Sequence, residues 1–254
     1  MRRVVFNQKG GVGKSTIACN LAAISASEGN RTLVIDLDAQ CNASQYLLGH
    51  EYFEIKTTIF SFFEELLAFS FRKKGLIDCI VKTKFKNLDI MPSHSNLFDL
   101  QDKLESRYKM YKLRDSLDEL TSYDYIYIDT PPALNFYSRS ALIAADACLI
   151  PFDCDYFSRQ ALYTLIDNVR EIQQDHNSGL EIEGVVVNQF QSRAKLPTKI
   201  IDDLIKEGLP VLDSYLSSSI KIRESHDLCL PMIYLDSSHK LTTEFQALYK
   251  ELNG

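Results

Sequence analysis

The stretch Lys9-Gly10-Gly11-Val12-Gly13-Lys14-Ser15-Thr16 decides how this chain is expected to fold. Residues 4–7 come just before it and form a short, mostly apolar run that is typical of a strand. Residues 14–28 follow with apolar side chains at helical spacing, and Gly29 is a suitable residue to end that helix. A glycine-rich loop between a strand and a helix is the context in which many proteins hold phosphate groups.

The residue types in this loop suit phosphate binding for physical reasons. Glycines let backbone N–H groups turn inward toward phosphate oxygens, and the start of the helix adds the positive end of its dipole. The Lys14 ammonium can reach the terminal phosphates, and the Ser15 hydroxyl can hold Mg²⁺. A glycine-rich turn with a chance Gly-Lys-Ser is the alternative, and the fit of the whole stretch disfavours it. The expected ATP contacts in the loop are Lys9, Gly10, Gly11, Val12, Gly13, Lys14, Ser15 and Thr16.

The composition excludes several classes of protein. The chain has 254 residues, of which 45% are apolar, so it can bury a substantial core. Its formal net charge of −6 excludes a generally basic surface, and any contact with nucleic acid needs a local cationic patch. None of the six cysteines forms a C-x-x-C pair, and no apolar run reaches the ~18 residues of a membrane span. We expect a cytoplasmic protein with reduced cysteines.

Near-continuous apolar runs alternate with helical stretches along the rest of the chain. Such runs are typical of strands buried on both faces, and their alternation with helices favours a parallel sheet. We expect residues 1–254 to form a single domain with a doubly wound α/β fold, in which helices cover both faces of a mostly parallel sheet of about seven or eight strands. The expected strands are residues 32–36, 88–91, 125–129, 147–152 and 183–188, and the expected helices are residues 96–106, 109–121, 159–174 and 198–207.

Carboxylates follow two of the expected strands. Asp36 ends one strand, with Asp38 two residues further on, and Asp129 ends another. Ligands bind outside the carboxyl ends of strands in open α/β sheets, so these side chains are expected to lie beside the phosphate loop. Carboxylate oxygens also suit Mg²⁺. The alternative for Asp36 and Asp38 is a turn rich in Asp and Asn after a strand.

The loop departs from the ordinary P-loop pattern, G-x-x-x-x-G-K-[ST], because Gln8 stands in place of the first glycine and Lys9 follows it. In this respect it resembles the deviant Walker A family of P-loop ATPases, which includes the ParA and Soj partition ATPases, MinD and the nitrogenase iron protein. The resemblance implies that Lys9 reaches across a dimer interface to the partner's nucleotide, and that two chains form a homodimer around two ATP molecules. The alternative for Lys9 is a solvated loop lysine.

The resemblance also assigns roles to the carboxylates. The run Asp36-Leu-Asp38-Ala-Gln-Cys-Asn-Ala-Ser resembles the switch I segment of the family. This implies that Asp38 orients the attacking water, as part of a catalytic set with Lys9 and Lys14, and that Asp36 lies nearer the Mg²⁺ ion. The run Asp129-Thr-Pro-Pro resembles switch II, which makes Asp129 a Mg²⁺ ligand together with Ser15.

Further contacts are implied by the last third of the chain. Asn188, at the end of an expected strand, matches a position near adenine in the family, although Asn at a strand end is also a common turn former. Residues 192–195 and 217–226 resemble segments with which partition ATPases bind DNA non-specifically in the ATP dimer. A solvated surface of mixed charge is the alternative. The implied DNA contacts are Arg193, Lys195, Lys199, Lys221 and Arg223.

These features favour an ATP-driven partition or positioning ATPase that associates with the nucleoid when ATP is bound and responds to an adaptor of the ParB type. A membrane-bound switch like MinD is the first rival. Residues 58–71 could form a membrane-surface helix, but we expect a core or dimer-facing helix, because aromatic-rich helices usually bury their apolar face. The C-terminal end, with one late cation in Lys250, also argues against a membrane contact. An amidoligase like cobyrinic acid a,c-diamide synthase is the second rival, and it would need a glutaminase domain.

Overall fold

The computed structural model describes residues 1–68, 75–154, 156–191 and 195–254. Within these residues, strands form one seven-stranded sheet in the order β3-β4-β2-β5-β1-β6-β7. Only the edge strand β3 runs antiparallel to its neighbour among the described pairs. The strands are β1 (Arg2–Val5), β2 (Thr32–Asp36), β3 (Val81–Lys82), β4 (Leu88–Met91), β5 (Tyr125–Asp129), β6 (Ala147–Asp153) and β7 (Glu181–Asn188).

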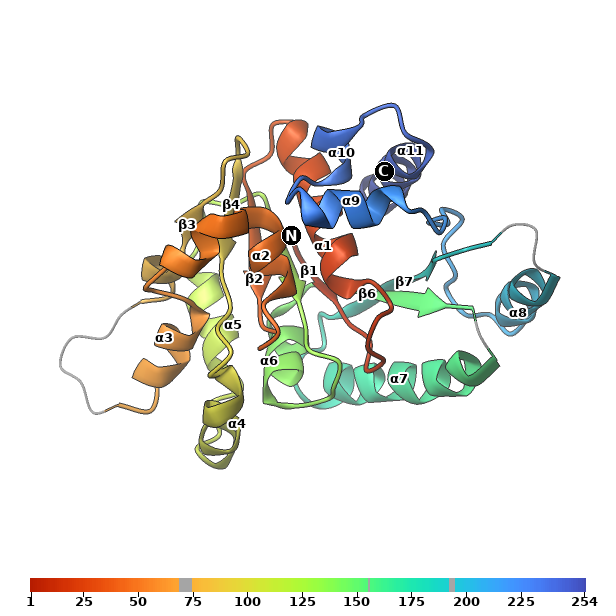
Figure 1. The fold of residues 1–254 in the computed structure, drawn as a ribbon. Helices are drawn as coiled ribbons and strands as arrows, with labels where there is room; N and C mark the ends of the chain where they lie inside the picture. Colours follow the sequence, from red (N-terminus) through yellow and green to blue (C-terminus); the bar gives the residue numbers. More distant parts are fainter. Residues whose placement is uncertain (69–74, 155, 192–194) are drawn as a thin grey trace.

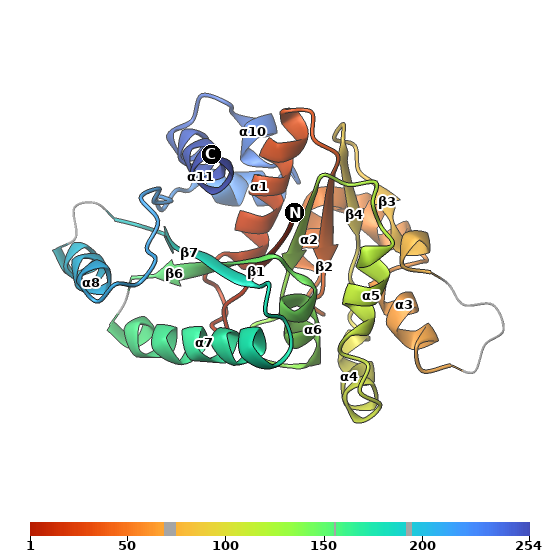
Figure 2. The same cartoon turned by 180° about the vertical axis from the view of Figure 1, so that it is seen from behind.

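Helices cover both faces of the sheet (Figures 1 and 2), so the predicted doubly wound α/β fold is confirmed. The α-helices are α1 (Lys14–Ser27), α2 (Asn42–Leu48), α3 (Ile59–Glu65), α4 (Leu97–Ser106), α5 (Lys112–Asp118), α6 (Phe136–Ala144), α7 (Tyr156–Asp175), α8 (Lys195–Lys206), α9 (Lys221–Asp227), α10 (Met232–Leu235) and α11 (Lys240–Asn253). The described residues also form two short 3-10 helices, η1 (Gly49–Glu54) and η2 (Leu76–Cys79).

Two apolar cores lie on opposite faces of the sheet because side chains of a strand alternate in direction. On β1, Val4 belongs to one core and Val5 to the other. The first core joins the sheet to α3, α4, α5, α6 and α7, and the second joins it to α1, α2, α10 and α11. The strands between these layers are buried on both faces, which explains why they appear in the sequence as continuous apolar runs.

The strand order sets the place of the site. Strands β2, β5 and β1 are neighbours, with Asp36 paired in register with Asp129 and Val5 paired with the same residue from the other side. The carboxyl ends of these three strands therefore meet at one edge of the sheet. The chain that leaves β1 continues there as the glycine-rich loop and enters α1. This is the crevice in which open α/β sheets bind ligands.

The aromatic segment at residues 58–71 forms α3 over part of its length. Ile59, Phe62 and Phe63 of this helix are buried in the first core, and Phe63 makes edge contacts with Phe136. Its residues 69–71 lie outside the described part of the chain. Among the residues that the structure describes, no helix is both long and apolar enough to cross a membrane.

An ion pair lies near the amino ends of β1 and β7. The Arg3 side chain, which is 1% exposed, donates two hydrogen bonds of 2.5 Å to the carboxylate of Glu183 on β7. It also donates to the Leu252 carbonyl at 3.2 Å and to the Asn253 side chain at 3.3 Å. These bonds hold the last turn of α11 against β1 and β7. The glycine-rich loop lies at the other, carboxyl ends of the strands.

Candidate nucleotide-binding site

The glycine-rich loop has backbone geometry that only glycine adopts easily. Gly11 and Gly13 have positive φ angles of 76° and 89°. A Cβ atom at Gly13 would also lie 2.3 Å from the side-chain nitrogen of Asn188, so a larger residue there meets both strain and a clash. The loop ends at the first turn of α1, where N–H groups at the helix start point toward the loop.

Side chains at the carboxyl end of β7 hold the loop in place. The Asn188 amide, at the end of β7, donates to the Val12 carbonyl at 2.8 Å, and the Gln189 amide donates to the Gly11 carbonyl at 2.9 Å. Within the loop, the Lys9 N–H donates to the Asn7 side chain at 2.8 Å, and the Lys14 ammonium donates to the Lys9 carbonyl at 3.2 Å. Asn188 thus has a structural contact, and its predicted contact with adenine remains a prediction.

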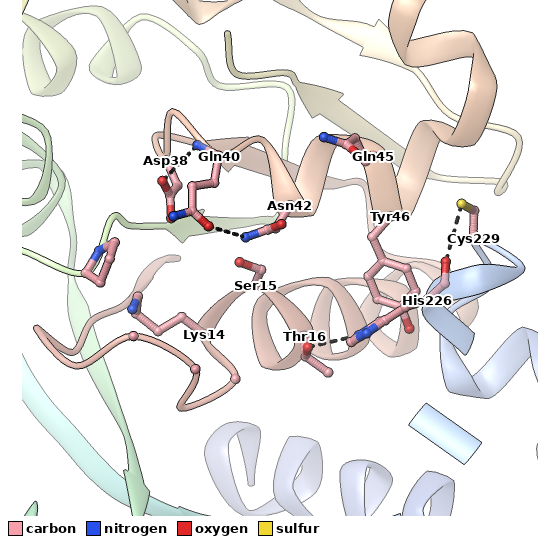
Figure 3. Close-up of a pocket in the computed structure, with 14 residues that line it drawn as sticks. Lys14, Ser15, Thr16, Asp38, Gln40, Asn42, Gln45, Tyr46, His226 and Cys229 are labelled. Atoms are coloured by element: carbon pink, nitrogen blue, oxygen red, sulfur yellow. Dashed lines mark hydrogen bonds between the residues drawn. The ribbon is translucent and has the colours of Figure 1, made fainter. Parts of the chain in front are cut away.

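A cavity of about 510 Å³ lies over the loop (Figure 3). In the close-up, Asp38 and Gln40 face Lys14 and Ser15 across this space, while Tyr46 and His226 border its far end. A volume of this order suits a small-molecule ligand such as a nucleotide. The lining residues are Gly10, Gly11, Gly13, Lys14, Ser15, Thr16, Asp38, Gln40, Asn42, Gln45, Tyr46, Pro132, His226 and Cys229.

Asp36 is fully buried and its oxygens are engaged by its own chain. One oxygen accepts the Asp38 N–H at 3.0 Å, and the other accepts the N–H and hydroxyl of Ser44 at 2.8 and 2.6 Å. Burial, opposed by these hydrogen bonds, raises the pKa of Asp36 to about 7. The side chain therefore fixes the turn from β2 into α2. It does not line the cavity, and its predicted place near Mg²⁺ remains a prediction.

Asp38 does line the cavity and is nearly buried, at 7% exposed. One of its oxygens accepts the Gln40 N–H at 3.0 Å, which sets the direction of the carboxylate. The next turn depends on Cys41, which has a positive φ of 59° and donates its N–H to the Asp38 carbonyl at 2.9 Å. Burial raises the pKa of Asp38, and the Lys14 ammonium acts against that change.

Asp129, at the end of β5, is the third carboxylate near the glycine-rich loop. It is fully buried, and one oxygen accepts the Thr130 N–H at 3.1 Å. The other oxygen is buried and has no hydrogen-bond partner among the described residues. The Ser15 hydroxyl interacts with this carboxylate, while burial, with the negative charge of Asp36, raises the pKa of Asp129. An orphaned carboxylate oxygen beside a hydroxyl fits Mg²⁺, which prefers oxygen ligands.

No group of three or more His, Cys, Asp and Glu side chains among the described residues could hold a metal ion by itself. A Mg²⁺ ion beside a nucleotide is usually bound through one or two protein oxygens, water and phosphate, because Mg²⁺ keeps several of its waters. Lys14, which is 7% exposed, supplies the main positive charge nearby. Burial lowers the pKa of Lys14, while Asp129 and Asp38 act to raise it.

Lys9 lies in the loop but is not among the residues that line the cavity. Its ammonium lies 3.4 Å from the carboxylate of Asp153 at the end of β6, and both side chains are well exposed, at 42% and 36%. An exposed pair of this kind contributes at most about 1 kcal/mol. The pair with Asp153 alone therefore adds little to holding the Lys9 side chain in place.

The predicted DNA contacts are placed only in part. Arg193 lies outside the described residues, and for Lys195 the structure describes the backbone at the start of α8 alone. Lys199 is exposed on α8, and Arg223 is exposed on α9. Lys221, also on α9, pairs with Glu224 at 2.8 Å. Figures 1 and 2 place α8 at the outer edge of the sheet and α9 beside α1, so the described cations occupy two separate elements.

Several cavity residues were not predicted from the sequence. Tyr46 and Gln45 come from α2, and His226 and Cys229 come from the segment around α9. The sequence signals for them are weak, because α9 is short and lies more than 200 residues from the loop. Only the fold brings α9 to the start of α1, where the His226 ring nitrogen Nε2 lies 3.0 Å from the Thr16 hydroxyl.

The doubly wound sheet, the glycine-rich loop between β1 and α1, and the carboxylates at the ends of β2 and β5 define a P-loop ATPase. Residues 3–182 match the family model described as an AAA domain. The chain is 32% identical over 237 residues to the chromosome partitioning protein ParA of Caulobacter vibrioides, a match that covers 91% of this chain and 86% of that protein.

Two further comparisons agree with this match. The chain is 30% identical over 251 residues to the sporulation initiation inhibitor protein Soj of Bacillus subtilis, which covers 98% of this chain and 96% of Soj. The structure is also similar to that of Cyanothece McdA, with a TM-score of 0.86, 23% identity, and coverage of 100% of this chain and 99% of McdA. The chain belongs to the ParA/Soj family of deviant Walker A ATPases.

Proposed function

We propose that this protein is an ATP-driven partition or positioning ATPase that alternates between a monomer and an ATP-bound homodimer in the cytoplasm. The observation that supports this most strongly is one cavity lined by Lys14, Ser15 and Asp38, with the unpartnered oxygen of Asp129 beside Ser15. ATP would place its phosphates against the loop residues 9–16, where backbone N–H groups and Lys14 balance their charge.

Ser15 and Asp129 are the residues that would hold Mg²⁺. Asp36, the last residue of β2, would lie near the ion. When bound, the ion would neutralise charge on the terminal phosphates. Asp129 is suited to this role because its second oxygen, which has no hydrogen-bond partner among the described residues, is already desolvated. The side chain therefore needs no reorganisation to meet a cation.

Asp38 would orient the attacking water. Its carboxylate faces Lys14 across the cavity (Figure 3), and the hydrogen bond from the Gln40 N–H restricts its rotation. Positioning and charge neutralisation account for most catalysis of phosphoryl transfer. Lys9 would leave Asp153 and reach the partner's nucleotide, and loss of that exposed pair would cost at most about 1 kcal/mol.

We also infer that the ATP-bound dimer binds DNA non-specifically and that an adaptor of the ParB type stimulates hydrolysis. The names of the relatives support the partition role: ParA of Caulobacter vibrioides is a chromosome partitioning protein. The chain is acidic overall, so the DNA contact has to come from local cations on α8 and α9. Pairing two copies would double the phosphate contacts available to one duplex and raise affinity steeply.

A mobility shift on random duplex DNA tests this function. The wild-type protein with ATP and Mg²⁺ is expected to retard DNA at low salt, and Lys14→Ala, which loses the main phosphate cation, is expected not to. The double variant Lys221→Glu, Arg223→Glu should bind ATP normally but lose DNA binding, with a weaker dependence on salt in any residual binding. ATP-independent DNA binding, or unchanged binding by the double variant, would contradict the proposal.

A further inference from the structure

One contact joins the C-terminal third of the chain to the phosphate end of the candidate site. The ring nitrogen Nε2 of His226, on α9, lies 3.0 Å from the hydroxyl oxygen of Thr16, in the first turn of α1 (Figure 3). Both residues line the same cavity. Thr16 follows directly on Ser15, so its hydroxyl lies where the helix start would face the phosphates of a bound nucleotide.

The His226 ring is held in place from a second side. The ring of Tyr46, on α2, meets it edge to face at a centroid distance of 4.7 Å. The Tyr46 hydroxyl shares a hydrogen bond with the hydroxyl of Ser225, next to His226 in the chain, and accepts a bond of 3.2 Å from Asn20 on α1. The orientation of the imidazole is therefore fixed by α1, α2 and α9 together.

Asn20 extends this arrangement to the next segment. Its amide nitrogen also donates to the Thr16 carbonyl at 2.8 Å, and its amide oxygen accepts the Met232 N–H at 2.8 Å. Tyr46, Asn20 and Ser225 are all buried. Polar groups that satisfy one another in a buried network tend to adopt a single arrangement, so α9 is docked on α1 in a defined position.

The direction of the hydrogen bond between His226 and Thr16 matters for ligand binding. A threonine hydroxyl has one proton to donate and can also accept. If Nε2 accepts that proton, the hydroxyl has none left for a phosphate. If Nε2 carries the proton and donates it, the Thr16 hydroxyl remains free to donate to a phosphate oxygen. Phosphate oxygens accept hydrogen bonds, so a bound nucleotide would select the second arrangement.

We propose that His226 is a positioning residue for the nucleotide: its Nε2–H group donates to the Thr16 hydroxyl and turns that hydroxyl toward the phosphates. This inference rests on the proposed nucleotide site. Partial burial lowers the pKa of His226, which keeps an exposed face, and this favours the neutral ring with one ring N–H. Because His226 belongs to the same short helix as Lys221 and Arg223, nucleotide binding also stabilises the docked position of the helix that carries these cations.

The test measures ADP affinity by calorimetry in four variants. His226→Phe keeps a ring against Tyr46 but removes the donor, while His226→Gln keeps an N–H donor on a side chain of similar reach. Thr16→Val removes the hydroxyl and keeps the shape. We expect His226→Phe and Thr16→Val each to weaken ADP binding roughly three- to tenfold, as loss of one hydrogen bond does, and His226→Gln to stay within about twofold of wild type.

The fourth variant, Thr16→Val with His226→Phe, completes a double-mutant cycle. If His226 acts through Thr16, the double variant binds ADP no more weakly than the worse single variant. Thermal unfolding without nucleotide measures any loss of packing separately. Additive losses, or His226→Phe that binds ADP as wild type does, would overturn the role of His226 while leaving the nucleotide site intact. A wild-type protein that binds no ADP would overturn the proposed function, and this inference with it.

Discussion

At the scale of single residues, Gly13 carries the strictest requirement in the loop. Its φ of 89° strains any other residue, and a Cβ atom 2.3 Å from the Asn188 amide nitrogen would displace that amide from the loop. Gly13→Ala is therefore expected to lose nucleotide binding in calorimetry and to lose more stability than strain alone explains. Gly208→Ala is the matched control, because its φ of 79° imposes similar strain with nothing within 4 Å.

The comparison of Gly13→Ala with Gly208→Ala separates the effect of backbone strain from the effect of the contact with Asn188. Gly208→Ala should lower the free energy of unfolding by about 1–2 kcal/mol and leave ADP affinity unchanged. Urea denaturation measures the first quantity. Equal losses of stability in the two variants, with nucleotide binding intact in Gly13→Ala, would show that the contact with Asn188 does not shape the loop.

Asp129 is the residue through which Mg²⁺ is expected to strengthen ATP binding. We expect Mg²⁺ to raise the affinity of the wild-type protein for ATP. In Asp129→Asn, ATP affinity in the presence of Mg²⁺ should fall roughly ten- to a hundredfold, because a charge-assisted contact worth about 1.5–3 kcal/mol disappears. Calorimetry with Mg²⁺ and with EDTA measures it. Asp36→Asn, at a carboxylate with both oxygens engaged, should mainly destabilise the turn into α2. Full Mg²⁺ dependence in Asp129→Asn would place the ion elsewhere.

The sequence predicts a side chain of the site only where that side chain belongs to a local motif and the fold also turns it toward the cavity. Asp38 and Lys14 line the cavity, as their motifs led us to expect. Asp36 has the same local pattern as Asp38, but Ser44 and the Asp38 N–H engage its oxygens. His226 belongs to the site through a tertiary contact alone, and no spacing along the chain encodes such a contact.

At the scale of the elements, the periodic and buried segments could be predicted well. The strands Thr32–Asp36, Leu88–Met91 and Tyr125–Asp129 have the expected bounds, because continuous burial leaves a continuous apolar run. Helix ends follow less closely from the sequence: the pattern predicts a helix over residues 109–121, but α5 covers only Lys112–Asp118. The short helices α9 and α10 have too few turns to show a period, and tertiary packing determines them.

The position of α11 on the sheet depends on Arg3. Arg3 is the buried cation that joins β1 to Glu183 and to the end of α11. Arg3→Leu should lower the free energy of unfolding by about 2–4 kcal/mol, because Glu183 keeps an unpaired charge in a partly buried site. Arg2→Leu is the control: Arg2 pairs with Asp118, which is 61% exposed, and should cost less than about 1 kcal/mol.

Urea denaturation of the two arginine variants compares these free energies directly. ADP affinity should be unchanged in both variants, since Arg2 and Arg3 lie at the amino end of β1 and the glycine-rich loop follows its carboxyl end. Similar small losses in Arg3→Leu and Arg2→Leu would mean that the ion pair does not hold α11 on the sheet.

At the scale of the whole molecule, the strand order brings the ends of β1, β2 and β5 to one edge, and the site follows from that order. The doubly wound fold could be predicted because strand–helix alternation allows few other architectures. The arrangement of surface cations could not, because exposed Lys and Arg leave no periodic signal. Lys199 on α8 and Arg223 on α9 lie on separate elements whose relation depends on the complete fold.

The central claim is that ATP drives two copies of this chain together. Sedimentation of Asp38→Ala with ATP and Mg²⁺ tests it most directly, because a variant that binds ATP but hydrolyses it poorly accumulates the ATP-bound state. We predict a species of twice the 29.0 kDa of one chain with ATP, a monomer with ADP, and a weakened dimer when Lys9→Ala is added. A verified ATP-bound Asp38→Ala protein that sediments only as a monomer would contradict the account.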